Sequence, residues 1–140
     1  MPGECGAVVK ADGYGVGATK ATESLIGAGC RRFFVATIDE AISLRNSVTG
    51  DFRVYVLEGL ISKHILPEFD AYDLVPVLNT PENIRTWSEH AKSKGGRRAV
   101  LALDTGMNRL VEEGDSCSSA IRKEVIPVVS NALGATVSSC

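Results

Sequence analysis

The residues whose types and spacing could support chemistry lie near the start of the chain, in the stretch AVVKADGYGVGA at positions 7–18. Lys10 follows two β-branched residues and leads directly into a glycine-rich turn. A lysine amine is a poor nucleophile in neutral water, but it forms an imine with an aldehyde when it is held close in a low-dielectric pocket. The turn offers backbone amides, and Tyr14 offers a hydroxyl, to a phosphate group. The stretch therefore predicts covalent chemistry on an aldehyde cofactor with a phosphate, and pyridoxal phosphate fits that description.

The same turn also satisfies a second pattern. Gly13, Gly15 and Ala18 fit G-x-G-x-x-A, and Asp39 follows near the next strand end, as in dinucleotide-binding folds. In those folds the apolar residues of the strand run into the first glycine. Here Lys10, Ala11 and Asp12 stand between the apolar residues and the first glycine. A lysine beside the turn would have no role in such a fold. A dinucleotide-binding domain is therefore the weaker interpretation.

Short apolar runs rich in β-branched residues alternate with helical patterns along the chain. They predict strands near residues 6–10, 33–37, 53–57, 74–78 and 98–103, with a weaker sixth at 125–131. Such strands, separated by helices, are typical of a parallel sheet with right-handed crossovers. The sequence therefore predicts an α/β fold.

In such folds the ligand binds beyond the carboxyl ends of the strands. Several polar residues follow the predicted strands there: Lys10, Asp12, Tyr14, Asp39, Glu58, Asn79, Asp104 and Arg109. Asp12 and Asp104 are expected to hold backbone amides in their loops rather than to do chemistry.

Sequence patterns typical of helix starts occur between the predicted strands. Thr37 stands three residues before Glu40, as in a capping box, and Thr80 precedes Pro81 as an N-cap precedes the first helical residue. Trp87 lies on an apolar helix face that is expected to pack against the sheet. His64 and His90 fall in predicted helices away from the strand ends, and both are expected to be exposed.

Composition narrows the class of protein. The 140 residues carry a net charge of −2, with 44% hydrophobic residues, so a nucleic-acid or membrane-surface partner is not indicated. The four cysteines are widely spaced and no histidine cluster accompanies them, so no metal site is predicted. No apolar run approaches the ~20 residues of a membrane span and no signal-peptide pattern begins the chain. We expect one domain in the cytoplasm.

Two stretches carry a resemblance to a known family. AVVKADGYGVGA resembles the cofactor-lysine motif of the pyridoxal-phosphate-dependent alanine racemases, and LALDTGMNRL at 101–110 resembles that family's motif at the fifth barrel strand. FFVATIDEAISLR and YVLEGL also look like the family. The resemblance is clear over residues 6–111 and weak over 115–140. It implies an incomplete (β/α)8 TIM-like barrel of five to six parallel strands, with residues 1–140 as part of the N-terminal domain and the C-terminal β domain absent.

The resemblance also implies residue roles. Lys10 would be the covalent attachment point of pyridoxal phosphate and one of two catalytic bases. Tyr14 would lie at the cofactor's phosphate end. Arg109 would lie near the cofactor's phenolic oxygen and bind the substrate carboxylate, with Met107 close by.

Three positions depart from the family pattern. Many members carry a lysine, often carbamylated, where this chain has Ala102, so another group would have to orient Arg109. Val16 replaces a histidine that is common in the first motif. Val111 replaces the glycine that usually follows NRL, and a β-branched residue resists a positive φ.

The implied activity is the interconversion of L-alanine and D-alanine, which supplies D-alanine for peptidoglycan, by a homodimer acting on a small amino acid. In the family the second base is a tyrosine from the C-terminal domain of the other subunit, so the 140-residue chain is expected to be inactive alone. Two alternatives stay open: a noncatalytic pyridoxal-phosphate-binding barrel protein, and a non-functional fragment.

Overall fold

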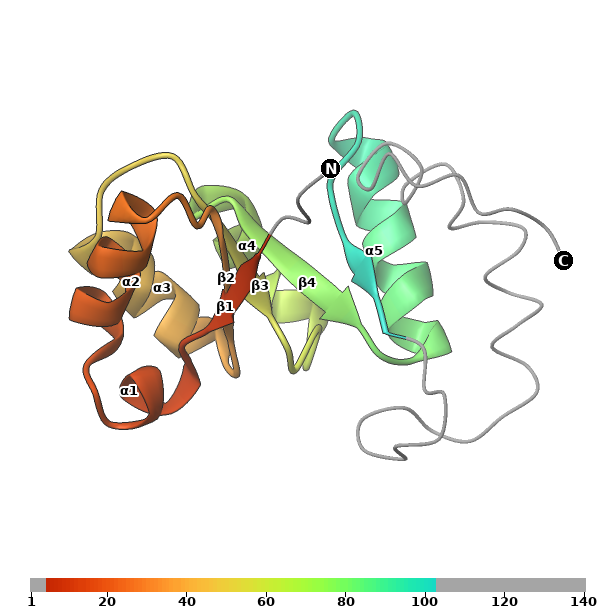
Figure 1. Ribbon diagram of the computed structural model, residues 1–140. Helices are drawn as coiled ribbons and strands as arrows, with labels where there is room; N and C mark the ends of the chain where they lie inside the picture. The colour runs from red at the N-terminus through yellow and green to blue at the C-terminus, as the bar shows by residue number, and fades with distance from the viewer. Residues whose placement is uncertain (1–4, 103–140) are drawn as a thin grey trace, which may run out of the picture.

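The centre of the molecule is a parallel sheet, seen in a computed structural model that describes residues 5–102 (Figure 1). Its strands are β1 (Gly6–Val8), β2 (Arg32–Val35), β3 (Arg53–Val56), β4 (Leu74–Leu78) and β5 (Val100–Leu101). Every neighbouring pair is parallel, and the strands lie side by side in chain order. The predicted α/β fold with an incomplete barrel is confirmed as a five-stranded half-barrel. The predicted sixth strand lies outside the described residues.

Helices alternate with these strands. They are α1 (Lys10–Tyr14), α2 (Ala18–Gly27), α3 (Ile38–Ser47), the short 3-10 helix η1 (Lys63–Ile65), α4 (Leu66–Ala71) and α5 (Pro81–Ser93). None of the helices within residues 5–102 combines the length and the apolar character that a membrane span requires.

The sequential strand order excludes the dinucleotide-binding interpretation. A doubly wound sheet reverses its strand order at a switch point, and the ligand binds in the crevice formed there. The order β1-β2-β3-β4-β5 contains no such reversal. The G-x-G-x-x-A match at Gly13 is therefore a coincidence of turn composition.

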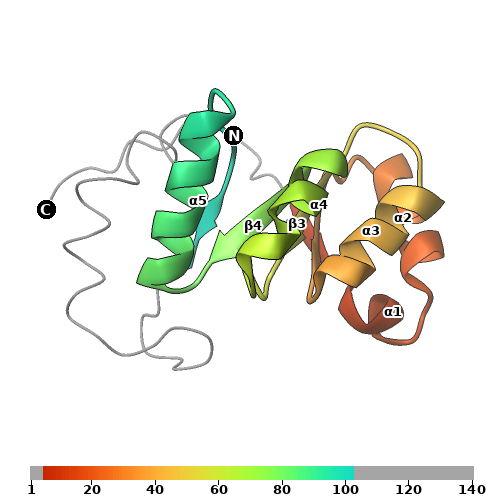
Figure 2. The same cartoon turned by 180° about the vertical axis from the view of Figure 1, so that it is seen from behind.

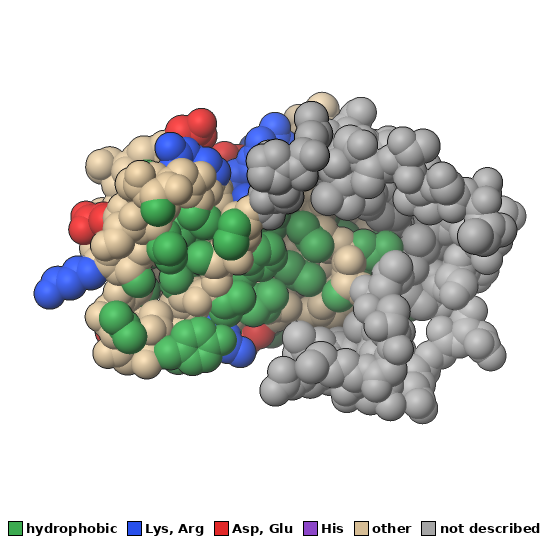
Figure 3. Space-filling model, viewed as in Figure 1, with side chains coloured by type: hydrophobic (Ala, Val, Ile, Leu, Met, Phe, Trp, Pro, Cys, Tyr) green, Lys and Arg blue, Asp and Glu red, His purple; other side chains and the backbone are tan. Residues whose placement is uncertain are grey.

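The two faces of the sheet differ in what covers them. Alternate strand residues, among them Phe33, Val54 and Leu78, are buried in one cluster with Phe69 and Trp87 from the helices. The helices on that side stand in front in Figure 2. The intervening residues form a second cluster of strand and strand-end side chains around Tyr55, Val75 and Val77, with Phe34, Leu57, Val100 and Ala102 packed against it. Hydrophobic side chains gather across the middle of the face shown in Figure 3.

Predicted caps fix the helix starts beyond the carboxyl ends of β2 and β4. The Thr37 hydroxyl accepts a hydrogen bond from the Glu40 N–H at 3.3 Å, and the Glu40 carboxylate accepts one from the Thr37 N–H at 3.5 Å. The Thr80 hydroxyl accepts from the Asn83 N–H at 3.1 Å, with Pro81 as the first helical residue. Both N-cap predictions are confirmed.

One exposure prediction was wrong. His64 is exposed, but only 12% of the His90 side chain is accessible. The His90 Nε2 atom lies 3.1 Å from the Asp70 carboxylate in α4, and its ring centroid is 5.5 Å from that of Trp87. His90 follows Trp87 by about one helical turn, so it borders the buried face of α5 where α4 packs.

Candidate functional site

Parallel pairing brings the ends of the first four strands to one edge of the sheet. Lys10 follows β1 by two residues, Ala36 follows β2, Glu58 follows β3 by two residues and Asn79 follows β4. The predicted strand-end position of Lys10 is confirmed. Asp39, which was also predicted near a strand end, lies instead in the first turn of α3, where it is exposed.

The backbone after Lys10, within α1, is a left-handed turn rather than a right-handed helix. Ala11, Asp12, Gly13 and Tyr14 have φ values of 51°, 51°, 63° and 56°. A non-glycine residue in this region costs about 1–2 kcal/mol. Three such residues in succession around one glycine therefore make the turn a strained segment, of the kind that persists where surrounding contacts hold it. The glycine-rich turn was predicted from the sequence; its handedness was not.

Local hydrogen bonds close the turn. The Gly13 N–H donates to the Val9 carbonyl at 2.9 Å, and the Gly17 N–H donates to the Asp12 carbonyl at 2.9 Å. The Asp12 carboxylate accepts from the Ala18 N–H at 2.8 Å. Gly17, the N-cap residue of α2, offers no side-chain acceptor, so Asp12 caps this helix from six positions upstream. The predicted loop-holding role of Asp12 is confirmed.

The turn brings Lys10 and Tyr14 together. The Lys10 Nζ atom lies 6.0 Å from the centroid of the Tyr14 ring, the outer range of a cation–π contact. Lys10 is half-buried, whereas Tyr14 is 65% exposed. Within residues 5–102 no carboxylate lies within ion-pair distance of Lys10. The amine is thus close to a phenol and is not neutralised by a described acid.

A carboxylate from α3 holds the other side of the turn. Glu40 Oε1 accepts from the Ala11 N–H at 2.8 Å, and Glu40 Oε2 accepts from the Ala36 N–H at 2.8 Å. The sequence marked Glu40 only as part of a capping box. Its contact with Ala11 joins residues 29 positions apart, so no local pattern could have revealed it.

Asn79 and Glu58 occupy the same edge without forming a cluster with Lys10. Asn79 is 7% exposed, and its side-chain amide donates to the Leu57 carbonyl at 2.9 Å. That bond ties the ends of β3 and β4 together. Glu58 is exposed, and its N–H donates to the Ala36 carbonyl at 3.1 Å. In the described part of the chain, the hydrogen bonds of both residues join neighbouring strand ends.

Several predicted residues lie outside the described part of the chain. They are Asp104, Met107, Arg109 and Val111. Ala102 is the last described residue, and its N–H donates to the Leu78 carbonyl at 3.0 Å. Among residues 5–102, no group of three or more His, Cys, Asp or Glu side chains could hold a metal ion.

Arg45 is a half-buried arginine in the last turn of α3. Burial lowers the pKa of its guanidinium, against the opposing effect of Asp73 and Asp51. The guanidinium donates to the carbonyls of Phe52 and Asp73 at 2.9 and 3.0 Å and stacks 4.6 Å from the Phe52 ring. These contacts assign Arg45 a structural role.

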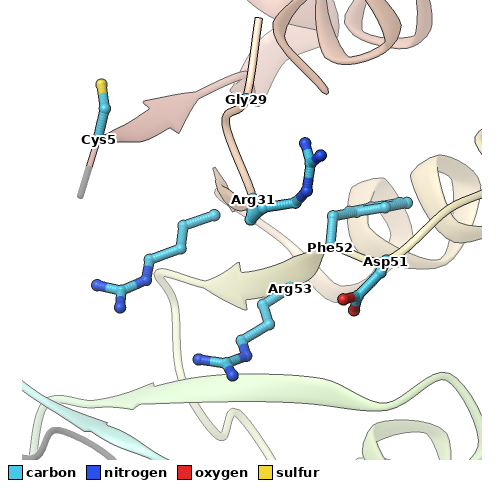
Figure 4. A pocket seen from close by; sticks show the side chains of 7 residues that line it. Cys5, Gly29, Arg31, Asp51, Phe52 and Arg53 are labelled. Atoms are coloured by element: carbon cyan, nitrogen blue, oxygen red, sulfur yellow. The ribbon is translucent and has the colours of Figure 1, made fainter. Parts of the chain in front are cut away.

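A hollow of about 290 Å³ lies at the opposite edge of the sheet, by the amino ends of β1, β2 and β3 (Figure 4). Its lining residues are Cys5, Gly29, Arg31, Arg32, Asp51, Phe52 and Arg53. Arg31 is already engaged, because its guanidinium donates to the carbonyls of Ile26 and Cys30 at 2.7 and 2.9 Å. None of the predicted site residues lines this hollow. The candidate site is therefore the carboxyl edge around Lys10.

Comparison with known proteins gives consistent similarities. Residues 1–124 match the family described as "Alanine racemase, N-terminal domain". The chain is 41% identical over 110 residues to "Alanine racemase 3" of Salmonella typhi, covering 78% of this chain and 30% of that protein. It is 47% identical over 105 residues to "Alanine racemase, catabolic" of Agrobacterium fabrum, covering 74% of this chain and 27% of that protein. The chain thus spans about a third or less of these relatives.

Solved structures share the fold. Alanine racemase from Bartonella henselae, with covalently bound pyridoxal phosphate, superposes with a TM-score of 0.82 and 33% identity, over 95% of this chain and 38% of that one. Histidine racemase from Leuconostoc mesenteroides subsp. sake superposes with a TM-score of 0.71 and 28% identity, over 88% of this chain and 33% of that one.

Proposed function

We propose that this chain, which belongs to the alanine racemase N-terminal domain family, supplies the pyridoxal-phosphate lysine of an enzyme that interconverts L-alanine and D-alanine. One observation carries the proposal: Lys10 stands at the carboxyl edge of a parallel half-barrel on a strained turn, with its amine near Tyr14 and with no described carboxylate within ion-pair distance. Active sites of barrel enzymes lie at this edge. Backbone strain of this kind clusters at functional sites.

The described residues fit such a cofactor. An aldehyde needs an accessible primary amine, and Lys10 is half-buried without an ion-pair partner in residues 5–102. A phosphate needs hydrogen-bond donors, and the Tyr14 hydroxyl is on an exposed side chain of the same turn. We assign Lys10 to the covalent attachment and Tyr14 to the phosphate end.

When bound, pyridoxal phosphate acts as an electron sink that stabilises the carbanion left when the α-proton of an amino acid departs. The proton itself must be moved by the protein. We assign this step on one face of the substrate to the Lys10 Nζ atom, which can accept and return a proton at the α-carbon when its amine is not bonded to the cofactor. A positioned acid or base of this kind contributes about 10²–10⁴-fold to a rate.

Arg109 and Met107 complete the proposal from outside the described residues. A guanidinium can hold a carboxylate through two parallel hydrogen bonds, so we assign Arg109 to the substrate carboxylate and the cofactor's phenolic oxygen. Met107 stands two positions before it in the same motif, and we place it beside the substrate. With Ala102 in place of the family's lysine, Arg109 must be oriented by another group.

Racemisation needs a second base on the opposite face of the α-carbon, and the described tyrosines do not offer one. Tyr55 is 7% exposed within β3 and stacks on Phe34 with ring centroids 4.7 Å apart. Tyr72 caps the end of α4, before β4 begins, so it lies at the amino edge. We therefore propose that the 140-residue polypeptide does not racemise alanine by itself and acts with further protein, as in a family homodimer.

Alanine is the substrate we favour because the relatives named above at 41% and 47% identity are alanine racemases. D-alanine supply for peptidoglycan in the cytoplasm is the physiological role that we attach to this activity. The histidine racemase at 28% identity carries a different substrate on the same fold. L-histidine is therefore the comparison substrate in any assay.

Covalent labelling tests the proposal directly. The full 140-residue chain is incubated with pyridoxal phosphate, reduced with borohydride and mapped by peptide mass spectrometry. We expect the label on the peptide that contains Lys10, and its loss in Lys10→Ala. Lys20→Ala, which removes an exposed lysine of α2, is the matched control and should keep the label. Label spread evenly over Lys20, Lys63 and Lys92 would contradict the assignment.

A racemisation assay tests the proposal that the chain does not racemise alanine by itself. The chain alone, with saturating cofactor, should give no robust turnover of L-alanine or L-histidine. Addition of a polypeptide that carries the remaining strands and C-terminal domain of a related racemase should produce D-alanine. Robust turnover by the chain alone would show that a second base is present in these 140 residues.

A further inference from the structure

The Glu40 carboxylate connects two segments that come together only in the folded chain. Glu40 Oε1 accepts from the Ala11 N–H at 2.8 Å, directly after Lys10. Glu40 Oε2 accepts from the N–H groups of Ala36 at 2.8 Å and Thr37 at 3.5 Å. One side chain of α3 therefore ties the lysine turn to the carboxyl end of β2.

The three hydrogen bonds accepted by Glu40 differ in length. A capping box requires Glu40 to accept from the N-cap residue Thr37, and at 3.5 Å that is the longest of its three contacts. The bonds to Ala11 and Ala36 are both 2.8 Å, the length expected of charge-assisted hydrogen bonds. The carboxylate is thus placed for the two strand-end segments rather than for the helix start alone.

The bond to Ala11 lies at the start of the strained turn. Ala11 is the first residue of the left-handed run, at φ 51° and ψ 51°. The remaining bonds that close the turn all join residues within the segment 9–18. Among the described residues, Glu40 is the side chain that reaches the turn from a separate element. Strained conformations persist only where the surroundings over-determine them, and Glu40 supplies that constraint from outside the turn.

We infer that Glu40 is a positioning residue for Lys10: it holds the left-handed turn in register with β2 and so fixes where the lysine amine stands at the carboxyl edge. The inference rests on the proposed function of Lys10. Glu40 touches neither substrate nor cofactor in this assignment and acts through the Ala11 N–H.

The test compares two nearly isosteric substitutions in the full 140-residue chain. Glu40→Gln keeps the shape but replaces one acceptor oxygen with an NH2 donor, so Gln cannot accept from both Ala11 and Ala36. Thr37→Val removes the hydroxyl that caps α3 and leaves the Glu40 carboxylate intact. Three quantities are measured in each: amide hydrogen exchange at Ala11, the yield of borohydride-fixed pyridoxal phosphate at Lys10, and the urea midpoint.

In Glu40→Gln we expect the rate of amide hydrogen exchange at Ala11 to rise about tenfold, because one charge-assisted hydrogen bond is lost. We expect the yield of label at Lys10 to fall by about the same factor. In Thr37→Val we expect a lower urea midpoint with Ala11 exchange and Lys10 labelling unchanged. Glu40→Asp retains a negative charge in the first turn of α3 but is one methylene shorter. It should show the same loss at Lys10, and it serves as the test variant if Glu40→Gln fails to fold.

Unchanged Lys10 labelling in the folded Glu40 variant overturns the inference, and so does an equal loss of labelling in Thr37→Val. A parent chain that takes no label at Lys10 overturns the proposed function instead. In that case Ala11 exchange in the Glu40 variant still decides whether the carboxylate holds the turn, since this measurement needs no cofactor.

Discussion

Replacing Ala11 with glycine is expected to stabilise the chain, the reverse of what this change does in a right-handed helix. Ala11 lies at φ 51° and ψ 51°. An L-residue pays about 1–2 kcal/mol in that region, and glycine does not. Against this gain stands the larger backbone entropy of glycine in the unfolded chain, about 0.4–1 kcal/mol. The difference is a stabilisation of about 0–1.6 kcal/mol, and the Ala11 N–H to Glu40 bond is retained.

Ala21→Gly is the matched control. Ala21 lies inside α2, where no positive φ occurs, so the same change should lower the free energy of unfolding by about 1 kcal/mol. Trp87 is 1% exposed, and its fluorescence reports urea unfolding of the full chain. A gap of about 2 kcal/mol between the variants corresponds to a midpoint difference of about 1 M urea. If Ala11→Gly destabilises as much as Ala21→Gly, the left-handed turn and the strain argued from it are refuted.

Two further predictions concern other positions. Gly59→Ala should lower the free energy of unfolding by about 2–5 kcal/mol, because Gly59 has φ +67° and its added Cβ would overlap the Val77 carbonyl oxygen. Gly15→Ala, at φ +85° with nothing within 4 Å, should cost only about 1–2 kcal/mol; equal urea midpoints for the two variants would contradict the steric argument. Asp70→Asn should lower the free energy of unfolding by about 1 kcal/mol, because the Asp70 carboxylate lies 3.0 Å from Arg97 and 3.1 Å from His90. Both contacts are within ion-pair distance, but neither is an aligned hydrogen bond. Asp73→Asn, at an 85% exposed side chain 3.8 Å from Arg97, should change the urea midpoint little, and an effect as large as that of Asp70→Asn would refute the assigned difference.

Local patterns in the sequence determined the order of elements. The strand positions could be predicted because β-branched apolar runs are continuous in a sheet buried on both faces, and every predicted strand within the described residues is present. The starts of α3 and α5 could be predicted because an N-cap acts on residues two or three positions away. The place of Lys10 followed from the same logic, since it stands where a strand pattern meets a glycine-rich turn.

Only the tertiary structure decided how that turn is built and held. The left-handed conformation of the turn opposes the intrinsic preference of Ala11 and Tyr14, so it cannot be read from propensity. The Glu40 carboxylate reaches Ala11 across 29 residues because parallel pairing of β1 with β2 brings the two strand ends together. His90 is covered for the same kind of reason, since its burial depends on α4 packing beside α5. Sequence patterns act within a few residues, whereas strain and burial are set by neighbours that the fold alone brings into contact.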